Sequence, residues 1–126
     1  MVKKEKSSIL IIEDDIFLSD LYKTKMELEG FKVFAAYDGE KGLELVKKNK
    51  PEIILLDLIL PKITGFQVLE KIKQDVAIKD IPIIILTNLS QKADVDKGLK
   101  MGADDYLIKA HFMPSEVVEK IKKLIS

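Results

Sequence analysis

Residues 53 to 57 read Ile53-Ile54-Leu55-Leu56-Asp57, four apolar residues in a row closed by an acid. A continuous apolar run of this length is typical of a strand whose two faces are both covered by helices, as in a parallel sheet. Four further runs of strand length recur at intervals of 20 to 30 residues, at residues 9–12, 33–36, 83–86 and 106–108. We therefore expect five short strands separated by longer segments.

The segments between these runs carry apolar side chains at helical spacing. Gly30 and Gly102 stand where a helix needs a left-handed residue to end, and Pro114 suits a first helical turn. The side chains expected to share a buried face in successive helices are Leu18, Leu21, Tyr22 and Leu28; Leu43 and Val46; Leu69 and Ile72; Val95 and Leu99; and Val117, Ile121 and Leu124. The alternation predicts a single-domain α/β fold, (βα)5, with a doubly wound five-stranded parallel sheet.

Length and composition exclude several classes of protein. The chain has 126 residues, which argues for one domain spanning residues 1–126. Zero cysteines exclude disulfides and thiolate zinc sites, and a single histidine excludes a multi-histidine metal site. The 21 basic and 21 acidic side chains cancel, so we expect no direct nucleic-acid partner. The apolar runs are far shorter than the roughly 20 residues of a membrane span, so we expect a cytoplasmic protein without a membrane partner.

Polar side chains follow four of the five apolar runs. In open parallel sheets, ligands bind beyond the carboxyl ends of the strands, and those ends lie at one edge. The residues expected at that edge are Glu13, Asp14 and Asp15 after the first run, Asp57 after the third, Thr87 and Asn88 after the fourth, and Lys109 after the fifth. The sequence therefore predicts one site that holds carboxylates, a hydroxyl and an ammonium.

The charges of this set restrict its chemistry. Two carboxylates about 4 Å apart repel each other by roughly 4 kcal/mol at an effective dielectric constant near 20, and Lys109 supplies only one compensating charge. A divalent ion with oxygen ligands resolves the excess, and Mg²⁺ typically binds one or two carboxylates, several waters and a phosphate oxygen. With such an ion present, a carboxylate can attack phosphorus and form an acyl phosphate, stabilised by a lysine and a threonine hydroxyl.

Four motifs occur in order along the chain. They are Ile9-Leu10-Ile11-Ile12-Glu13-Asp14-Asp15; Leu55-Leu56-Asp57 followed by Pro61 and Gly65; Ile85-Leu86-Thr87; and Gly102-Ala103-Asp104-Asp105-Tyr106-Leu107-Ile108-Lys109. With these motifs, almost the whole chain resembles the receiver domain of bacterial two-component response regulators, including the chemotaxis regulators. The resemblance implies a flavodoxin-like fold with strand order 2-1-3-4-5. It also implies a phosphoacceptor signalling domain rather than an enzyme.

The resemblance implies a magnesium site around the phosphoacceptor. Asp57 would accept the phosphoryl group. Asp14 would ligate Mg²⁺ directly, and Glu13 would act mainly through a metal-bound water. Asp57 itself and the backbone carbonyl of Ile59 would complete the protein ligands.

The same resemblance implies a conformational switch. Thr87 and Lys109 would hold the phosphoryl oxygens, and the ring of Tyr106 would turn inward when Thr87 moves towards the phosphoryl group. The output surface would comprise the fourth helix, the fifth strand and the fifth helix. The expected partners are a sensor histidine kinase or phosphotransfer protein as donor, an unidentified downstream protein and, on phosphorylation, a second copy of the chain.

Several positions depart from the usual family pattern. Ala110 follows Lys109 where proline, commonly with a cis bond, is usual. A cis bond before any other residue costs about 2.5 to 4 kcal/mol, so the loop is either trans and reshaped or strained. Asn88 replaces a smaller residue. Ile59 and Leu89 flank the path of the attacking water in this family, and because neither can orient a water, we expect slow autodephosphorylation.

Other functions compete with the phosphorylated switch. The Lys109-Ala110 segment is the one feature that favours a phosphorylation-independent pseudo-receiver, a protein-binding module that keeps the fold alone. A hydrolase with an aspartate nucleophile is disfavoured, because Ile59 stands where such enzymes carry a second aspartate. A nucleotide-binding protein is disfavoured because an acidic stretch, rather than a glycine-rich loop, follows the first apolar run.

Three further residues have simple structural interpretations. Asp15 is expected to be a first-turn acid, favoured by the helix dipole. Gly98 within the fourth helix costs about 1 kcal/mol relative to alanine, which either a tight packing contact or a softened signalling helix would explain. His111 is expected at the surface.

Overall fold

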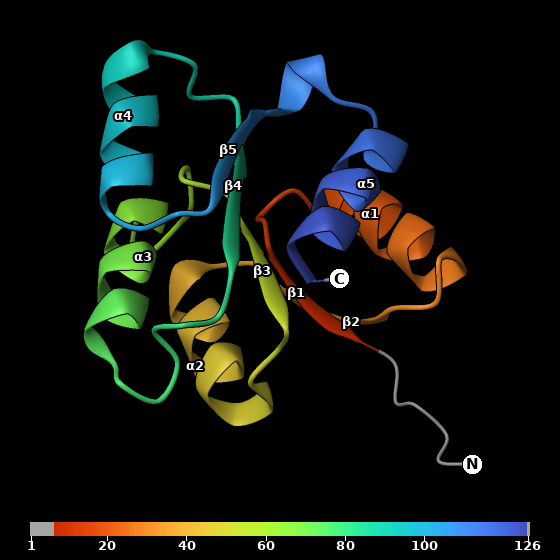
Figure 1. Ribbon diagram of the computed structural model, residues 1–126, viewed down its shortest axis with the longest axis horizontal. Helices are drawn as coiled ribbons and strands as arrows, with labels where there is room; N and C mark the ends of the chain where they lie inside the picture. The colour runs from red at the N-terminus through yellow and green to blue at the C-terminus, as the bar shows by residue number, and fades with distance from the viewer. Residues whose placement is uncertain (1–6, 126) are drawn as a thin grey trace.

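All five predicted strands are present in the computed structural model, which describes residues 7–125 (Figure 1). They are β1 (Ser8–Ile12), β2 (Lys32–Ala36), β3 (Ile53–Leu56), β4 (Ile83–Thr87) and β5 (Asp105–Ile108). The helices are α1 (Ile16–Leu28), α2 (Gly39–Asn49), α3 (Gly65–Gln74), α4 (Lys92–Lys100) and α5 (Pro114–Ile125), with a short 3-10 turn, η1 (Lys109–His111), before α5. The predicted (βα)5 order is therefore confirmed.

The strands form one parallel sheet in the order β2-β1-β3-β4-β5, as predicted. Ile9 of β1 lies opposite Val33 of β2 on one side and Ile53 of β3 on the other. From β1 the chain continues to β2 at one side of the sheet, whereas from β3 it continues to β4 at the other side. The strand order thus reverses between these two strands, which is where open α/β sheets form their ligand crevice.

Helices cover both faces of the sheet. Helices α1 and α5 lie on one face, and α2, α3 and α4 lie on the other (Figure 1). Successive side chains of a strand point to opposite faces. Accordingly Ile9 and Ile11 belong to the core beneath α1 and α5, whereas Leu10 and Ile12 belong to the core beneath α2 and α3. The strands read as continuous apolar runs because both of their faces are buried.

Helix α1 buries Tyr22 as predicted, but the prediction was wrong for Leu21 and Leu28. Leu21 is 55% exposed and Leu28 is 79% exposed, whereas Ser19, Tyr22 and Met26 are buried. The inner face follows positions 19, 22 and 26, which are three and four residues apart. Because the polar Ser19 occupies one of these positions, apolar spacing alone placed Leu21 and Leu28 on the buried face in its stead.

The predicted faces of the other helices are largely confirmed. The predicted residues that are buried are Val46, Leu69, Ile72, Val117 and Ile121. The prediction was wrong for Leu99 and Leu124, which are exposed. Gly98 is the buried residue of α4, and Leu124 lines an open groove beside Pro51 and Ile78.

The predicted helix boundaries are confirmed. Gly30 and Gly102 have positive φ angles of 94° and 110°, and α5 begins at Pro114. Asp15 is the N-cap of α1 rather than a residue of its first turn, because its carboxylate accepts a hydrogen bond of 3.1 Å from the Leu18 N–H. A cap of this kind satisfies one of the free N–H groups at the helix start.

Gly65, the first residue of α3, fixes how closely this helix approaches the end of β3. A Cβ atom on Gly65 would lie 2.2 Å from the backbone oxygen of Asp57 and 2.4 Å from the Cα of Leu58. Thr64 and Gln67 form a capping box around the same turn. Only glycine therefore allows α3 to start directly against the strand that carries Asp57.

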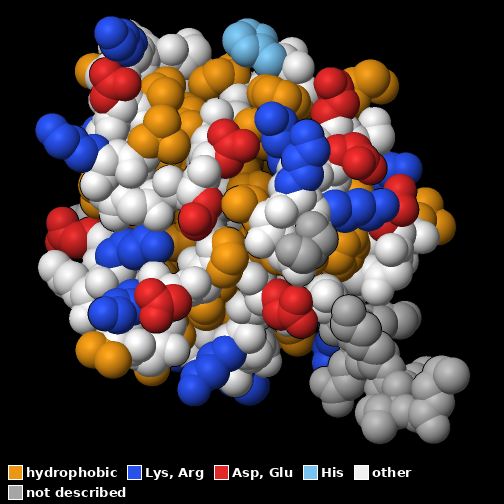
Figure 2. All heavy atoms as spheres, viewed as in Figure 1, with side chains coloured by type: hydrophobic (Ala, Val, Ile, Leu, Met, Phe, Trp, Pro, Cys, Tyr) orange, Lys and Arg blue, Asp and Glu red, His pale blue; other side chains and the backbone are white. Residues whose placement is uncertain are grey.

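None of the helices within residues 7–125 combines the length and the apolar character that crossing a bilayer requires. Acidic and basic side chains are interspersed over the face shown in Figure 2, without a large basic patch on that face.

Candidate functional site

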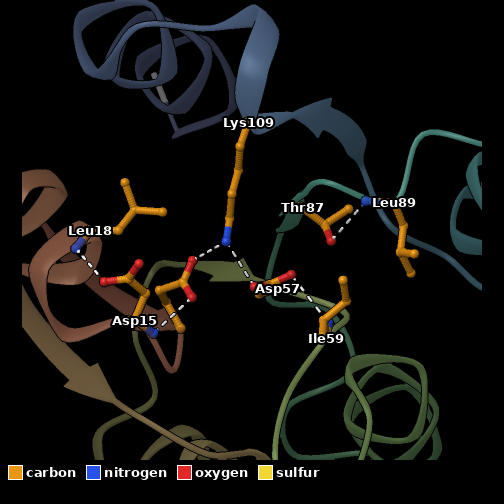
Figure 3. A network of polar contacts seen from close by, with 8 residues as sticks. Asp15, Leu18, Asp57, Ile59, Thr87, Leu89 and Lys109 are labelled. Atoms are coloured by element: carbon orange, nitrogen blue, oxygen red, sulfur yellow. Dashed lines mark hydrogen bonds and ion pairs between the residues drawn. The ribbon is translucent and has the colours of Figure 1, made fainter.

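Polar side chains meet at the carboxyl edge of the sheet, where Figure 3 shows Asp57, Thr87 and Lys109 close together. Glu13 and Asp14 follow β1, Asp57 follows β3, Thr87 ends β4, and Lys109 follows β5. Glu13, Asp57 and Thr87 are buried, whereas Asp14 is exposed at the rim. The parallel strands thus bring together side chains that lie up to 96 positions apart in the sequence, from Glu13 to Lys109.

Lys109 links two buried carboxylates. Its Nζ donates a hydrogen bond of 2.8 Å to Oδ2 of Asp57 and forms an ion pair with Oε1 of Glu13. The Lys109 side chain is 12% exposed, and the Glu13 and Asp57 side chains are each 5% exposed. Since one ammonium group cannot neutralise two carboxylates, and Asp14 adds a third acid, these four residues carry excess negative charge.

The acidic residues fit a hard divalent cation. One carboxylate oxygen from each of Glu13, Asp14 and Asp57 lies within 4.8 Å of the others. Oδ1 of Asp57 accepts a hydrogen bond of 3.2 Å from the N–H of Ile59, which restrains the carboxylate. An all-oxygen donor set with one ligand at the rim suits Mg²⁺, which keeps several of its waters.

Burial shifts the pKa of Glu13, and at Lys109 burial and hydrogen bonding shift the pKa in opposite directions. Burial raises the pKa of Glu13 above its ordinary value, although hydrogen bonds from Lys109 and from the Asp15 N–H oppose the rise. Burial lowers the pKa of Lys109, but its hydrogen bonds to Asp57 and Glu13 outweigh burial and raise that pKa overall. Lys109 therefore stays charged beside Asp57.

Thr87 and Tyr106 both contact the backbone of Leu89. Oγ1 of Thr87 accepts a hydrogen bond of 3.4 Å from the Leu89 N–H, and the Tyr106 hydroxyl donates one of 2.6 Å to the Leu89 carbonyl. Burial, followed by the charges of Asp94 and Asp57, raises the pKa of Tyr106 to about 12. The loop after β4 thus connects the site to the tyrosine of β5.

Gly98 provides the space for the ring of Tyr106. A Cβ atom on Gly98 would lie 3.1 Å from Cδ2 of Tyr106 and 2.7 Å from Cδ1 of Ile85. Of the two explanations for this glycine, the structure supports the tight packing contact.

The segment after Lys109 is reshaped without a cis bond. No cis peptide bond occurs among residues 7–125, so the Lys109-Ala110 bond is trans. Lys109, Ala110 and His111 form the 3-10 turn η1, and His111 is exposed, as predicted. Lys109 contacts both carboxylates although proline does not follow it.

Sequence reasoning missed the surroundings of two residues that it had named for other reasons. Leu89 acts through its backbone, which no side-chain pattern can reveal. Tyr22 of α1 is buried, and the charges of Lys109, Glu13 and Asp57 all act on its hydroxyl. The available signal was a tyrosine on the predicted buried face of the helix that follows the acidic motif, but it was interpreted only as a core residue.

The chain is similar to known proteins over nearly its whole length. Residues 9–122 match the family model of the response regulator receiver domain. The chain is 42% identical over 117 residues to the DNA-binding dual master transcriptional regulator RpaA of Synechocystis sp., covering 93% of this chain and 48% of that protein. It thus spans about half the length of the curated relatives it matches.

Solved structures are also similar to this fold. A response regulator from Chloroflexus aurantiacus has a TM-score of 0.89 and 30% identity, covering 96% of this chain and 98% of the other. A CheY-like receiver domain protein from Methanospirillum hungatei has a TM-score of 0.89 and 29% identity, covering 96% of this chain and 94% of the other.

Proposed function

Because the chain belongs to the response regulator receiver domain family, we propose that Asp57 accepts a phosphoryl group. Receiver domains are signalling modules of two-component systems rather than enzymes, and they interact with histidine kinases. The observation that carries the proposal is the environment of Asp57. Its buried carboxylate contacts the ammonium of Lys109 and lies within 4.8 Å of two further carboxylates.

The proposed donor is a phosphohistidine on a sensor kinase or a phosphotransfer protein. An oxygen of Asp57 forms a bond to phosphorus while the bond between phosphorus and the histidine nitrogen breaks, and the nitrogen keeps the electron pair. Lys109 and the Thr87 hydroxyl hold the phosphoryl oxygens, where negative charge accumulates. The raised pKa of Lys109 supports this role, because the side chain remains a cation throughout.

Mg²⁺ is the proposed cofactor. Asp14 and Asp57 are the direct carboxylate ligands, Glu13 acts through a metal-bound water, and the backbone carbonyl of Ile59 completes the protein ligands. When bound, Mg²⁺ would supply the positive charge that lets a carboxylate approach an anionic phosphoryl group. The excess of acids over Lys109 at this edge supports the assignment.

The switch is proposed to run from Thr87 to Tyr106. A phosphoryl group adds about −1.5 to −2 charges and three acceptor oxygens, which attract the Thr87 hydroxyl. Movement of Thr87 would displace Leu89, to which the Tyr106 hydroxyl is bonded. The altered surface would comprise α4, β5 and α5, and its partners would be a downstream protein and a second copy of the chain.

A small phosphodonor tests the proposal directly. Acetyl phosphate with Mg²⁺ should add one phosphoryl mass to the wild-type protein and none to Asp57→Asn, as measured by intact mass spectrometry. Asp15→Asn is the matched control, because asparagine is also a good N-cap and the substitution removes a neighbouring acid outside the proposed ligands. This variant should be phosphorylated like the wild type.

The same experiment separates the alternative function. If the folded wild type gains no phosphoryl mass from acetyl phosphate or from phosphoramidate, the chain is a phosphorylation-independent pseudo-receiver. Light scattering of the phosphorylated sample should show a larger mass than the untreated one if phosphorylation drives self-association. Asp57→Asn treated in the same way should show no such increase.

A further inference from the structure

Tyr22 is a buried tyrosine whose position the proposed phosphotransfer does not explain. It is 3% exposed and lies on the inner face of α1, within the core beneath α1 and α5. A buried tyrosine hydroxyl usually finds a hydrogen-bond partner. None of the hydrogen bonds that link Lys109, Asp57 and Glu13 uses the Tyr22 hydroxyl.

A small cavity lies directly beneath the carboxylates. Its polar lining comes from Glu13, Asp57 and Tyr22, and the rest of its wall is formed by apolar side chains of β1, β3 and β4. Its volume is about 10 Å³. This is close to the space that a single buried water needs, and such a water typically has two to four polar partners.

The charges of the site act on the Tyr22 hydroxyl. Burial raises the pKa of Tyr22; the charge of Lys109 opposes the rise, and the charges of Glu13 and Asp57 add to it. The phenol therefore remains neutral and can donate its proton in a hydrogen bond. Tyr22 is the one residue with an uncharged polar side chain among those that line the cavity, where the other two polar residues are acids.

Tyr22 lines the same cavity as Glu13 and Asp57. Lys109 contacts one oxygen of Asp57, and the Ile59 N–H contacts the other. Glu13 accepts from Lys109 and from the Asp15 N–H. When Lys109 turns towards a phosphoryl oxygen, Glu13 and Asp57 would each lose one of these contacts. A donor in the cavity would then keep their orientation.

We propose that Tyr22 is a positioning residue of the phosphoacceptor site, which donates through one water in the cavity to the carboxylates of Glu13 and Asp57. The inference rests on the proposed function and extends it to a residue behind the metal ligands. Such outer partners orient the ligating carboxylates, and their loss typically lowers metal affinity about 10-fold to 100-fold. Since Tyr22 acts through a water, we expect the lower end of this range.

Tyr22→Phe tests the inference, because it removes the hydroxyl and keeps the ring. Titration calorimetry with Mg²⁺ should give a dissociation constant about tenfold higher than that of the wild type. Urea unfolding without Mg²⁺ should change little, which separates positioning from a merely structural role. Tyr37→Phe is the matched control, because it removes an exposed hydroxyl outside the cavity, and its Mg²⁺ affinity should be unchanged.

A second measurement uses the wild type alone. A high-resolution crystal structure should show one water bonded to the Tyr22 hydroxyl and to Glu13 or Asp57. A dry cavity, or a Tyr22→Phe affinity within twofold of the wild type, would overturn the inference. Both results leave the proposed function intact, provided that acetyl phosphate still phosphorylates the wild type. That function fails instead if the wild type takes up neither Mg²⁺ nor a phosphoryl group.

Discussion

The Tyr106 hydroxyl donates a hydrogen bond of 2.6 Å to the backbone carbonyl of Leu89, 17 residues earlier in the chain. The N–H of the same Leu89 donates to Thr87. The backbone of Leu89 is therefore bonded to two side chains. One is the threonine proposed to bind the phosphoryl group, and the other is the tyrosine proposed to change position in response. A shift of Leu89 changes both contacts together.

The ionisation of Tyr106 should make the protein less stable at high pH. Burial raises the pKa of Tyr106 from 10.0 to about 12, which means that the fold favours the neutral phenol. Its contribution to stability is thus complete below pH 10 and is lost as the pH rises through about 12. The difference in phenolate absorbance between the wild type and Tyr106→Phe should titrate near pH 12. A midpoint near pH 10 would contradict the buried, bonded hydroxyl.

Gly98→Ala should displace Tyr106. Alanine would favour the helix by about 1 kcal/mol, but its Cβ would lie 3.1 Å from the ring. The end of the Ile85 side chain can move aside, so we expect the ring to shift outward at little cost in stability. The phenolate titration should then move towards lower pH than in the wild type. Gly30→Ala, at a glycine remote from the ring, should leave this titration unchanged.

Lys109→Ala should destabilise the metal-free protein and increase its dependence on Mg²⁺. The substitution leaves Glu13 and Asp57 buried without their cation, which typically costs about 3 to 5 kcal/mol. Urea unfolding should therefore show a large loss of stability without Mg²⁺ and a larger gain on adding Mg²⁺ than the wild type shows.

Lys122→Ala is the control for that measurement. Lys122 pairs with Glu29 at the surface, where solvent screens the ion pair. Its loss should be small and independent of Mg²⁺. Equal effects of the two substitutions would argue against a charge cluster at the proposed site.

Ser19→Ala should stabilise the protein. The Ser19 hydroxyl is buried in α1 and has no hydrogen-bond partner among the described residues. Leaving a buried polar group unpaired costs about 1 to 3 kcal/mol, and alanine also has the higher helix propensity. The urea midpoint should rise without a change in slope. A loss of stability would indicate that the hydroxyl has a partner, such as an ordered water.

The phosphorylated protein should lose its phosphoryl group slowly. Ile59 and Leu89 are apolar, and neither can orient an attacking water by hydrogen bonding. Ile59 is exposed, so a polar side chain there meets no packing penalty. Ile59→Asn should shorten the lifetime several-fold, as measured by decay of the phosphoryl mass. A rapid decay in the wild type that Ile59→Ala and Leu89→Ala leave unchanged would contradict the expectation.

The sequence was sufficient to predict the sheet and which charged side chains lie together at its carboxyl edge. The continuous apolar runs indicated strands with helices on both faces. Four of the five runs are followed by the polar residues that lie at the carboxyl edge. Asp57 and Lys109 could be placed together because parallel strands share this edge, although 52 positions separate them.

The contacts behind the site could not be predicted in the same way. The inner face of α1 includes the polar Ser19, so a search for apolar periodicity favoured Leu21 and Leu28. Tyr22 was correctly placed on the buried face, but nothing in the sequence indicated that it lines a cavity with Glu13 and Asp57. The trans bond before Ala110 was left open, because local preference alone does not determine the shape of the turn that carries Lys109.

Gly65 lies outside the charged cluster, but its lack of a side chain determines where the backbone of Asp57 can lie. Any larger residue would push against the carbonyl of Asp57 and the Cα of Leu58. Bulk at position 65 would therefore displace the backbone of Asp57, although no charged residue would be replaced. A variant that cannot be phosphorylated could therefore be made by substituting a larger residue at position 65, without changing any ionisable residue.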